Sequence, residues 1–405
     1  MSAEYDIIIV GSGIVGAATA LALARETSLK IAVIEAKLPR YNLDTTQYDH
    51  RVSAISLASK AILQNLNCWE SIKAKRLSAY TQMHVWDAKG SGEIHFDSQS
   101  LGESVLGYIV EDSVIRNSLH EQFEFYPTIN FLCPVALVSM EEKTNHIELM
   151  TQDQKILTTK LLIGADGAES WVRANAKIDL KNEDYAHTAI VASVTTTLPH
   201  QSTAWQRFLP TGPLAFLPFH DPYHCSIVWS AEHAYAKDLL ALDDVSFCKR
   251  VGDEFAHKLG EIAGISLRHS FPLRMRHVKQ YVHSRLALIG DAAHTVHPLA
   301  GQGVNLGLLD AAALAEVIVD AVKKNRDFSS LMTLRRYERW RKGDVVAMLT
   351  LVSGLKRLFG SEHESVKKAR TLGLAFVNDF PVVKNLLVSY ALGKRGDLPQ
   401  LVGLK

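Results

Sequence analysis

The sequence predicts a protein of the α/β class, α+β overall, with a parallel sheet as its main unit, a second mixed or antiparallel sheet and a helical C-terminal region. The chain begins with an apolar run, Ile7 to Val10, a glycine-rich turn, a helical stretch from Ile14 to about Arg25, and a second apolar run, Ile31 to Ile34. Apolar runs that alternate with helices are typical of buried parallel strands. Two later apolar runs, 161–163 and 286–289, also end in turns that pair glycine with an acid. One discontinuous domain therefore collects strands from distant parts of the chain.

The sequence pattern changes between the second and third of these glycine turns. Short β-rich pieces such as Leu214–Phe219 and Cys225–Trp229 are separated by proline and glycine pairs. That pattern favours a mixed or antiparallel sheet. Beyond Gly303 the chain turns helical. We expect a discontinuous first domain (1–75, 101–185 and 273–330), a second, β-sheet domain (76–100 and 186–272) and a C-terminal helical region (331–405).

Composition and charge exclude several classes of protein. The 405 residues are 47% hydrophobic and 21% charged, the values of an ordinary globular chain. The formal net charge of +1 creates no field that would attract nucleic acid, so we expect no nucleic-acid partner. The four cysteines show no CxxC spacing, which favours thiols in a reducing compartment over disulfides or a zinc site. With neither a signal peptide nor an apolar run near about 18 residues, the sequence predicts a cytoplasmic protein with no metal.

The first glycine turn has the spacing of a dinucleotide site. Gly11 permits a tight turn, Gly13 lets the backbone approach a pyrophosphate, and Gly16 lets the following helix pack closely on the strand. That helix presents free N–H groups and a positive dipole end to the phosphates. Glu35 lies 19 residues after Gly16, where an acid accepts hydrogen bonds from ribose hydroxyls. The acid repels a 2′-phosphate, which excludes NADP here and leaves FAD or NAD; the alternative is a tight turn with no ligand.

Two later turns decide between FAD and NAD. Segment 164–173 contains Asp166 and Gly167 after one strand, and segment 290–307 contains Asp291 after another. Asp291 is placed to accept a hydrogen bond from a polyol hydroxyl. The N–H groups of the helix that opens at about Val304 are placed to stabilise negative charge on a reduced flavin. Glycine–acid turns this far apart suit one long, extended ligand, so the sequence predicts FAD in a Rossmann-type domain.

At these turns the sequence resembles the aromatic-hydroxylase flavoproteins of the para-hydroxybenzoate hydroxylase fold. It is most similar to the ubiquinone-biosynthesis hydroxylases, whose signature closely matches the segment from His297 to Gly307. The similarity covers nearly the whole chain. The stretches closest to the branch that hydroxylates a polyprenylphenol ring at the carbon called C5 are Arg51–Ile55, Val85–Asp87, Ile94–Asp97 and Arg335–Arg339.

The resemblance implies a place along FAD for each turn. Arg51 would lie near the pyrophosphate or the flavin, with Glu111 as a weaker contact. Asp291 would bind the ribityl chain. The ADP half would be bound by Gly11, Gly13, Gly16 and Glu35, and the pyrophosphate region and the nicotinamide donor by Asp166 and Gly167. The isoalloxazine would be wrapped by Pro298, Gly301, Gln302, Gly303, Val304 and Asn305.

The activity that the resemblance implies is an FAD-dependent aromatic monooxygenase. NAD(P)H would reduce the flavin, the reduced flavin would react with O2 at position C4a, and the phenol or quinol ring of a polyprenylated ubiquinone precursor would be hydroxylated. The flavin carries this chemistry, and no catalytic side chain is identified from the sequence. Two other classes remain open: a flavin reductase that saturates isoprenoid chains, and a non-catalytic flavin-binding subunit of a quinone-synthesis complex.

A prenylated phenol needs a long apolar tunnel in the substrate domain. Candidate lining residues are Phe208, Phe216, Leu217, Phe219 and Trp229, and the alternative is that they are ordinary core residues. His294 and His297 invite a catalytic interpretation, but we expect them to brace the loop around the flavin.

The C-terminal region mixes apolar stretches with basic residues. These features suit contact with the inner-membrane surface or with a ubiquinone-biosynthesis complex, and they suit packing against the enzyme body equally well. The basic residues are Lys356, Arg357, Lys367, Lys368 and Arg370.

Overall fold

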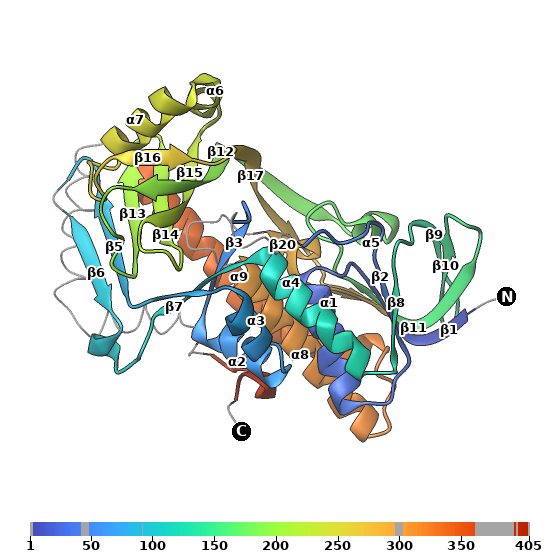
Figure 1. The fold of residues 1–405 in the computed structure, drawn as a ribbon. Helices are drawn as coiled ribbons and strands as arrows, with labels where there is room; N and C mark the ends of the chain where they lie inside the picture. The colour runs from blue at the N-terminus through green and yellow to red at the C-terminus, as the bar shows by residue number, and fades with distance from the viewer. Residues whose placement is uncertain are drawn as a thin grey trace.

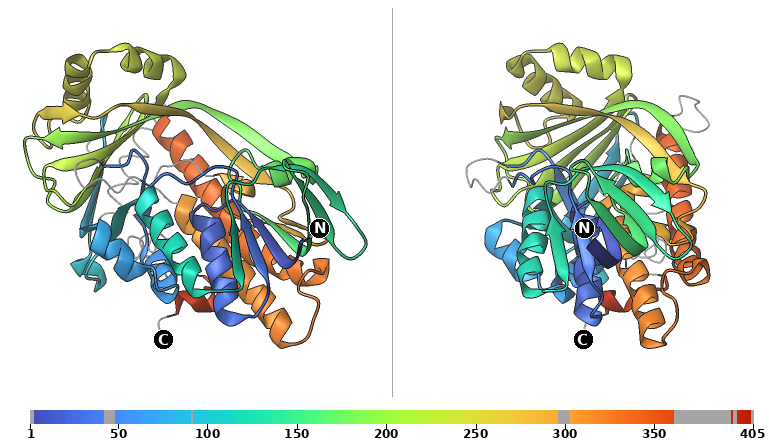
Figure 2. Two further views of the ribbon diagram at one scale, coloured as in Figure 1. Left: turned by 45° about the vertical axis from the view of Figure 1, so that its right-hand side comes forward. Right: turned by 90° about the vertical axis from the view of Figure 1, so that its right-hand side faces the viewer.

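The computed structural model describes residues 3–41, 48–90, 92–295, 303–360, 393 and 396–403. Two large sheets dominate the described part of the molecule, with a mainly parallel sheet at one end and a larger sheet at the other (Figures 1 and 2). No helix in the described part of the chain is long and apolar enough to cross a membrane.

The first sheet brings together the strands that the glycine turns predict. Its order is β18-β19-β11-β1-β2-β8, and the pairs from β19 to β8 are parallel. An antiparallel hairpin, β9–β10, extends β11. The strands are β1 (Ala3–Val10), β2 (Ile31–Ile34), β8 (Ile129–Leu132), β9 (Leu137–Glu142), β10 (Ile147–Thr151), β11 (Ile156–Gly164), β18 (Val282–His283) and β19 (Leu286–Leu288).

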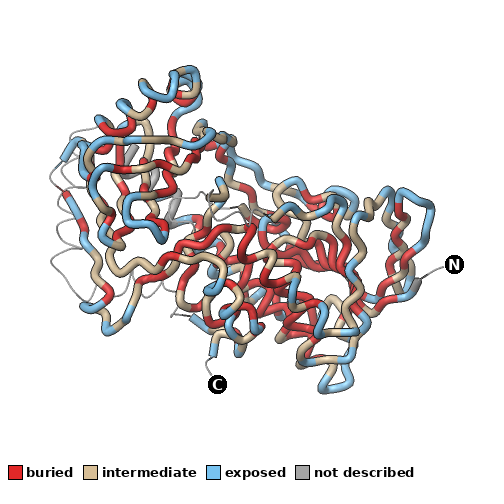
Figure 3. Tube along the Cα trace, in the orientation of Figure 1, coloured by how far each residue is buried: buried red, intermediate tan, exposed pale blue. Residues whose placement is uncertain are grey.

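Helices pack along this sheet and close its core. Helix α1 (Ile14–Glu26) contacts both α4 (Asp112–Glu121) and α8 (Gly303–Lys323), and α8 contacts α9 (Leu331–Gly360). The apolar runs of the sequence are continuous because these strands are covered on both faces; Ile7, Ile8 and Ile9 are fully buried. The buried residues concentrate here (Figure 3).

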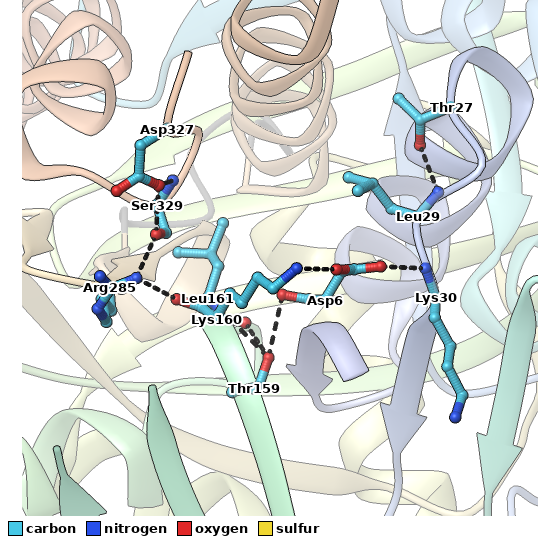
Figure 4. Close-up of polar contacts among 10 residues, drawn as sticks. All are labelled: Asp6, Thr27, Leu29, Lys30, Thr159, Lys160, Leu161, Arg285, Asp327 and Ser329. Carbon is cyan, nitrogen blue, oxygen red and sulfur yellow. Dashed lines mark hydrogen bonds and ion pairs between the residues drawn. The ribbon is translucent and has the colours of Figure 1, made fainter. Parts of the chain in front are cut away.

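Polar contacts secure the ends of the strands that lie away from the glycine turns (Figure 4). The carboxylate of Asp6 on β1 accepts hydrogen bonds from Lys160 Nζ on β11 at 2.8 Å and from Lys30 N at 2.9 Å. Arg285 Nη1 donates to Ser329 Oγ at 2.6 Å. At these strand ends, side-chain contacts therefore join segments that are distant in the sequence.

The second sheet is mixed, as its sequence texture predicts. Its order is β20-β17-β12-β15-β14-β13-β5-β6, with β16 on β12, and β13 pairs with β5 in parallel. The strands are β5 (Gln82–Asp87), β6 (Glu93–Asp97), β12 (Leu180–Thr196), β13 (Thr203–Leu209), β14 (Gly212–Pro218), β15 (His224–Glu232), β16 (Ile262–Ile265), β17 (His269–Val278) and β20 (His294–Thr295). Strands β12 and β17 run from one unit of the molecule into the other, so each crosses a domain boundary expected from the sequence.

Shorter elements complete the described chain. A small antiparallel sheet contains β3 (Val52–Ile55), β7 (Gly107–Glu111) and β4 (Ser78–Tyr80). The remaining α-helices are α2 (Leu57–Asn65), α3 (Trp69–Lys75), α5 (Trp171–Asn175), α6 (His233–Ala241) and α7 (Asp244–Glu254). The 3-10 helices are η1 (Gln99–Leu101), η2 (Gln122–Phe125), η3 (Gly290–Ala292) and η4 (Gln400–Val402).

The helical C-terminal region is present as α9 up to Gly360. Lys367, Lys368 and Arg370 lie outside the described residues, and so do the side chains of Lys356 and Arg357.

Candidate functional site: the cofactor turns

The first glycine turn has the geometry that its spacing predicts. Gly11 has a φ of +101°, and a Cβ atom there would lie 2.4 Å from the Ala165 carbonyl oxygen. A Cβ atom on Gly16 would lie 2.0 Å from the Gly11 carbonyl oxygen. A Cβ atom on Gly13 would meet nothing within 4 Å. Positions 11 and 16 therefore need glycine for the fold itself, whereas position 13 leaves open space that a ligand can enter.

The N-terminus of α1 faces the same space. Gly13 is the residue that precedes the helix, and no side chain caps this end. The first N–H groups of an α-helix have no partner within the helix and carry the positive end of its dipole. An uncapped N-terminus beside an open glycine suits a pyrophosphate, which is the fit that FAD requires.

Glu35 closes the turn from the end of β2. Its Oε2 atom accepts hydrogen bonds from both the backbone N and the Oγ atom of Ser12, each at 3.0 Å. The carboxylate is partly exposed, so part of it stays open toward solvent. Its contact with the ribose hydroxyls of FAD stays a prediction.

The second turn is held mainly by its own side chains. The Asp166 carboxylate accepts from Ser170 Oγ at 2.5 Å and from Val172 N at 3.0 Å, which ties it to the start of α5. Burial raises the pKa of Asp166 above its usual value. Gly167 has a φ of +81° and open space around it. Asp166 therefore shapes the turn, and a contact with FAD or the nicotinamide donor stays a prediction for both residues.

Two arginines that the sequence analysis missed join the second turn to its surroundings. Arg173 Nη1 donates to Ala292 O at 2.9 Å and Nη2 to Ala168 O at 2.7 Å, which links the second turn to the third. Arg276, on β17, donates to Ala168 O at 2.8 Å and to Glu169 at 2.6 Å. Arg173 belongs to segment 164–173, but its partner Ala292 lies more than a hundred residues further along the chain, so the sequence does not reveal the contact.

Asp291 lies in the third turn, within η3. Its side chain is exposed, yet surrounding protein atoms desolvate it and raise its pKa above the usual value. Nearby His294, Arg51 and Arg276 lower this pKa electrostatically, by less than burial raises it. Within the described chain no group donates a hydrogen bond to this carboxylate, which suits a polyol ligand.

Of the two histidines in the third motif, the structure describes His294. His294 is buried and its Nε2 atom lies 2.5 Å from Asp310 Oδ2, so it braces the turn as expected. Its partner Asp310 was missed by the sequence analysis. The available signal was a single acid in an otherwise apolar stretch of α8, since a buried charge requires a partner. His297 lies outside the described residues.

The start of α8 is tied to the small sheet. Asn305 Nδ2 donates to Ala54 O at 2.8 Å, and Asn305 Oδ1 accepts from Ser56 N at 3.0 Å. Asn305 therefore holds the helix start in place, while Gly303 has open space around it and Val304 is partly buried. The expected flavin contacts at Pro298, Gly301 and Gln302 lie outside the described residues.

Arg51 and Glu111 have different environments. Arg51 is exposed and close enough to act electrostatically on Asp291, and its contact with FAD stays a prediction. Glu111 is buried and binds Arg76 through both oxygens, at 2.5 and 2.8 Å, and also accepts from Asp49 N at 2.5 Å. Because both carboxylate oxygens already accept hydrogen bonds from protein groups, we interpret Glu111 as a support for the segment that leads to Arg51.

The five residues predicted to line a substrate tunnel do not all lie on the same face of the second sheet. Phe216 and Trp229 are fully buried in a core with Phe247 and Phe255, between the sheet and helices α6 and α7. Those two are core residues, because alternate residues of a strand point to opposite faces. Phe208 and Leu217 point to the opposite face of the sheet. Phe208 pairs with Pro213, and Leu217 pairs with Ser226. Phe219 stacks on Tyr48, with ring centroids 3.8 Å apart.

Comparisons with known proteins agree with this geometry. Residues 4–349 match the family model described as an FAD binding domain. The chain is 35% identical over 388 residues to the 3-demethoxyubiquinol 3-hydroxylase of Escherichia coli (strain K12), covering 96% of this chain and 98% of that protein. It is 33% identical over 436 residues to the mitochondrial ubiquinone biosynthesis monooxygenase COQ6 of Homo sapiens, covering 96% and 92%.

A solved structure shows the same fold. PqsL, a probable FAD-dependent monooxygenase from Pseudomonas aeruginosa, superposes with a TM-score of 0.77 at 21% identity and covers 92% of this chain and 100% of its own. FAD is the cofactor, and NAD(P)H is the electron donor typical of the family. The chain is therefore an FAD-dependent monooxygenase of the ubiquinone-biosynthesis hydroxylase family.

Proposed function

We propose that this enzyme hydroxylates the phenol or quinol ring of a polyprenylated ubiquinone precursor, using O2 and NAD(P)H. The observation that carries the proposal is the face of the second sheet opposite α6 and α7. Along this face the register aligns Val85, Gln206, Ala215, Val228 and Val191 across neighbouring strands. All but one of these side chains are apolar, which suits a lipid-linked ring.

The same face meets the cofactor unit. Met275 on β17 packs with Leu306, in the first turn of α8, and with Val345 and Leu349 of α9. His269, at the other end of β17, stacks on His50 with ring centroids 4.2 Å apart. Figures 1 and 2 show α9 running beneath this sheet. The apolar face therefore lies over the helix start that resembles the flavin loop of the family.

This arrangement suggests separate roles for the cofactor, the apolar face and the cofactor turns. Bound FAD supplies the activation of oxygen. The apolar side chains bind the prenylated ring and exclude water, and dryness favours hydroxylation over loss of hydrogen peroxide. The α1 N-terminus and the exposed Asp291 are the groups we assign to the phosphates and the ribityl chain.

Oxygen uptake by the purified, FAD-loaded enzyme tests this function. With a short-chain prenylphenol we expect NAD(P)H and O2 to be consumed in equal amounts, with a hydroxylated ring detected by mass spectrometry. Reduction of the side chain without oxygen uptake would instead indicate an isoprenoid reductase. Absence of turnover with any donor would indicate a flavin-binding subunit without catalytic activity.

The ring position and the cellular setting are further parts of the proposal. We place hydroxylation at C5 on the resemblance of the middle stretches. We place the enzyme at the inner-membrane surface, alone or in a ubiquinone-biosynthesis complex, because a polyprenyl tail partitions into lipid. Mass spectrometry of the quinone precursors that accumulate without this protein would identify the carbon.

Neighbouring residues on opposite faces of β14 test the substrate surface. Leu217→Ala should lower kcat/KM for a prenylated phenol about tenfold, since it removes apolar contacts to the substrate, and change stability little because the side chain is only partly buried. Phe216→Ala should lower the free energy of unfolding by about 3–5 kcal/mol and leave KM nearly unchanged. Steady-state kinetics and urea unfolding measure the two effects. The reverse pattern would place the substrate on the other face.

A further inference from the structure

Asp310 joins three elements directly beneath the third cofactor turn. Its Oδ2 atom accepts hydrogen bonds from His294 Nε2 on β20, at 2.5 Å, and from Gly290 N, at 3.1 Å. Its Oδ1 atom accepts from Arg341 Nε on α9 at 2.9 Å. Asp310, His294 and Arg341 are 0%, 2% and 1% exposed. Buried bonds of this kind are strong because water does not compete for them.

This network acts on the residue next to Asp291. The bond from Gly290 N to Asp310 holds the backbone at the start of the turn. Gly290 has a φ of +56°, and a Cβ atom there would lie 3.2 Å from Val15 Cγ2 of α1. The backbone of the turn is thus fixed from two sides. The Asp291 side chain, by contrast, is exposed and receives no hydrogen bond from the described part of the chain.

Further residues hold Arg341 and His294 in place. Arg341 Nη1 binds Asp344 Oδ2 at 2.8 Å, and the Tyr281 ring stacks on His294 with centroids 5.8 Å apart. Val345, one turn after Arg341, packs against Leu306 and Met275. Helix α9 therefore contacts both the network and the second sheet.

We propose that Asp310, His294 and Arg341 are positioning residues that direct the Asp291 carboxylate toward the ribityl chain of FAD. Rigid support for a contact residue strengthens binding because the contact geometry need not be ordered at the moment of binding. The proposal rests on the contact between Asp291 and FAD within the proposed function. It predicts an effect on the flavin half of the cofactor and none on the ADP half.

His294 variants of the full-length, flavin-free protein test the proposal. His294→Leu, which cannot donate to Asp310, should weaken FAD binding about tenfold, as expected for one charge-assisted hydrogen bond. Its affinity for ADP should be unchanged. His294→Gln carries an amide N–H group that can replace Nε2 and should recover most of the FAD affinity. Quenching of FAD fluorescence and calorimetry with ADP supply the dissociation constants.

A double-mutant cycle separates positioning from general loss of structure. If His294 acts through Asp291, then Asp291→Asn combined with His294→Leu should bind FAD no more weakly than Asp291→Asn alone. His200→Leu is the matched control, because His200 is 4% exposed and bonds to Phe219 O just after β14, in the other unit of the molecule. This control should leave the ratio of FAD to ADP affinity unchanged.

The outcomes are distinct. Equal weakening of FAD and ADP binding in His294→Leu, or additive effects in the cycle, would overturn the positioning role. An Asp291→Asn variant with normal FAD affinity would overturn the contact on which the proposal rests. Neither result depends on turnover, so failure of the proposed hydroxylation would be recognised separately by the oxygen-uptake assay.

Discussion

Gly13→Val is expected to fold normally and to lose FAD. A Cβ atom at position 13 meets nothing within 4 Å, and the backbone there, with φ −62° and ψ 179°, is open to any residue. The isopropyl group would instead occupy the space that the pyrophosphate needs beside the α1 N-terminus. We expect colourless protein whose FAD affinity falls by at least about a hundredfold, a loss of roughly 3 kcal/mol.

Absorbance in the flavin bands and thermal unfolding of the flavin-free protein measure the two parts of this prediction. Gly16→Ala is the matched control, because its Cβ atom would lie 2.0 Å from the Gly11 carbonyl oxygen. That variant should lose stability even without FAD. A yellow Gly13→Val protein with normal FAD affinity would refute the placement of the pyrophosphate.

Arg341→Met should be the most destabilising substitution in the network. It removes the guanidinium that pairs with Asp310 where both groups are almost fully buried. A buried charge left without its partner costs about 3–5 kcal/mol. Urea unfolding at neutral pH should show that loss. Adding Asp310→Leu to Arg341→Met should recover only part of it, because the change removes the uncompensated carboxylate but leaves His294 Nε2 and Gly290 N without their acceptor.

The pH dependence of stability follows from the same pair. Burial alone would raise the pKa of Asp310, but His294 and Arg341 lower it overall below its usual value. A carboxylate with a lowered folded pKa contributes stability that is present above its unfolded pKa of about 3.9 and is lost as pH falls through the folded value. We therefore expect the wild-type enzyme to keep this contribution down to about pH 4.

Arg341→Met should lose that contribution at higher pH than the wild type. Without the guanidinium, only His294 still offsets the effect of burial, so the pKa of Asp310 should lie higher than in the wild type. Unfolding free energies measured from neutral to acidic pH compare the two proteins. Identical pH profiles would show that Arg341 does not stabilise the ionised carboxylate.

The sequence alone determined the parallel sheet, its first crossover and the cofactor. Gly11 and Gly16 could be assigned from spacing because their roles are local: each lies within a few residues of the backbone that it must approach. The mixed second sheet followed in the same way from short β-rich pieces between turn residues. The resemblance supplied the family, because its signature lies in one continuous segment.

Only the tertiary structure decided which side chains lie in a core and which hold the turns in place. Phe216 and Leu217 are adjacent in sequence, and the choice of face depends on where α6 and α7 pack. Glu111 proved to bind Arg76, and Asp310 to bind Arg341, 31 residues away on another helix. Buried charges need partners, but sequence spacing does not say which distant element brings the partner, because that depends on how the sheets and helices pack.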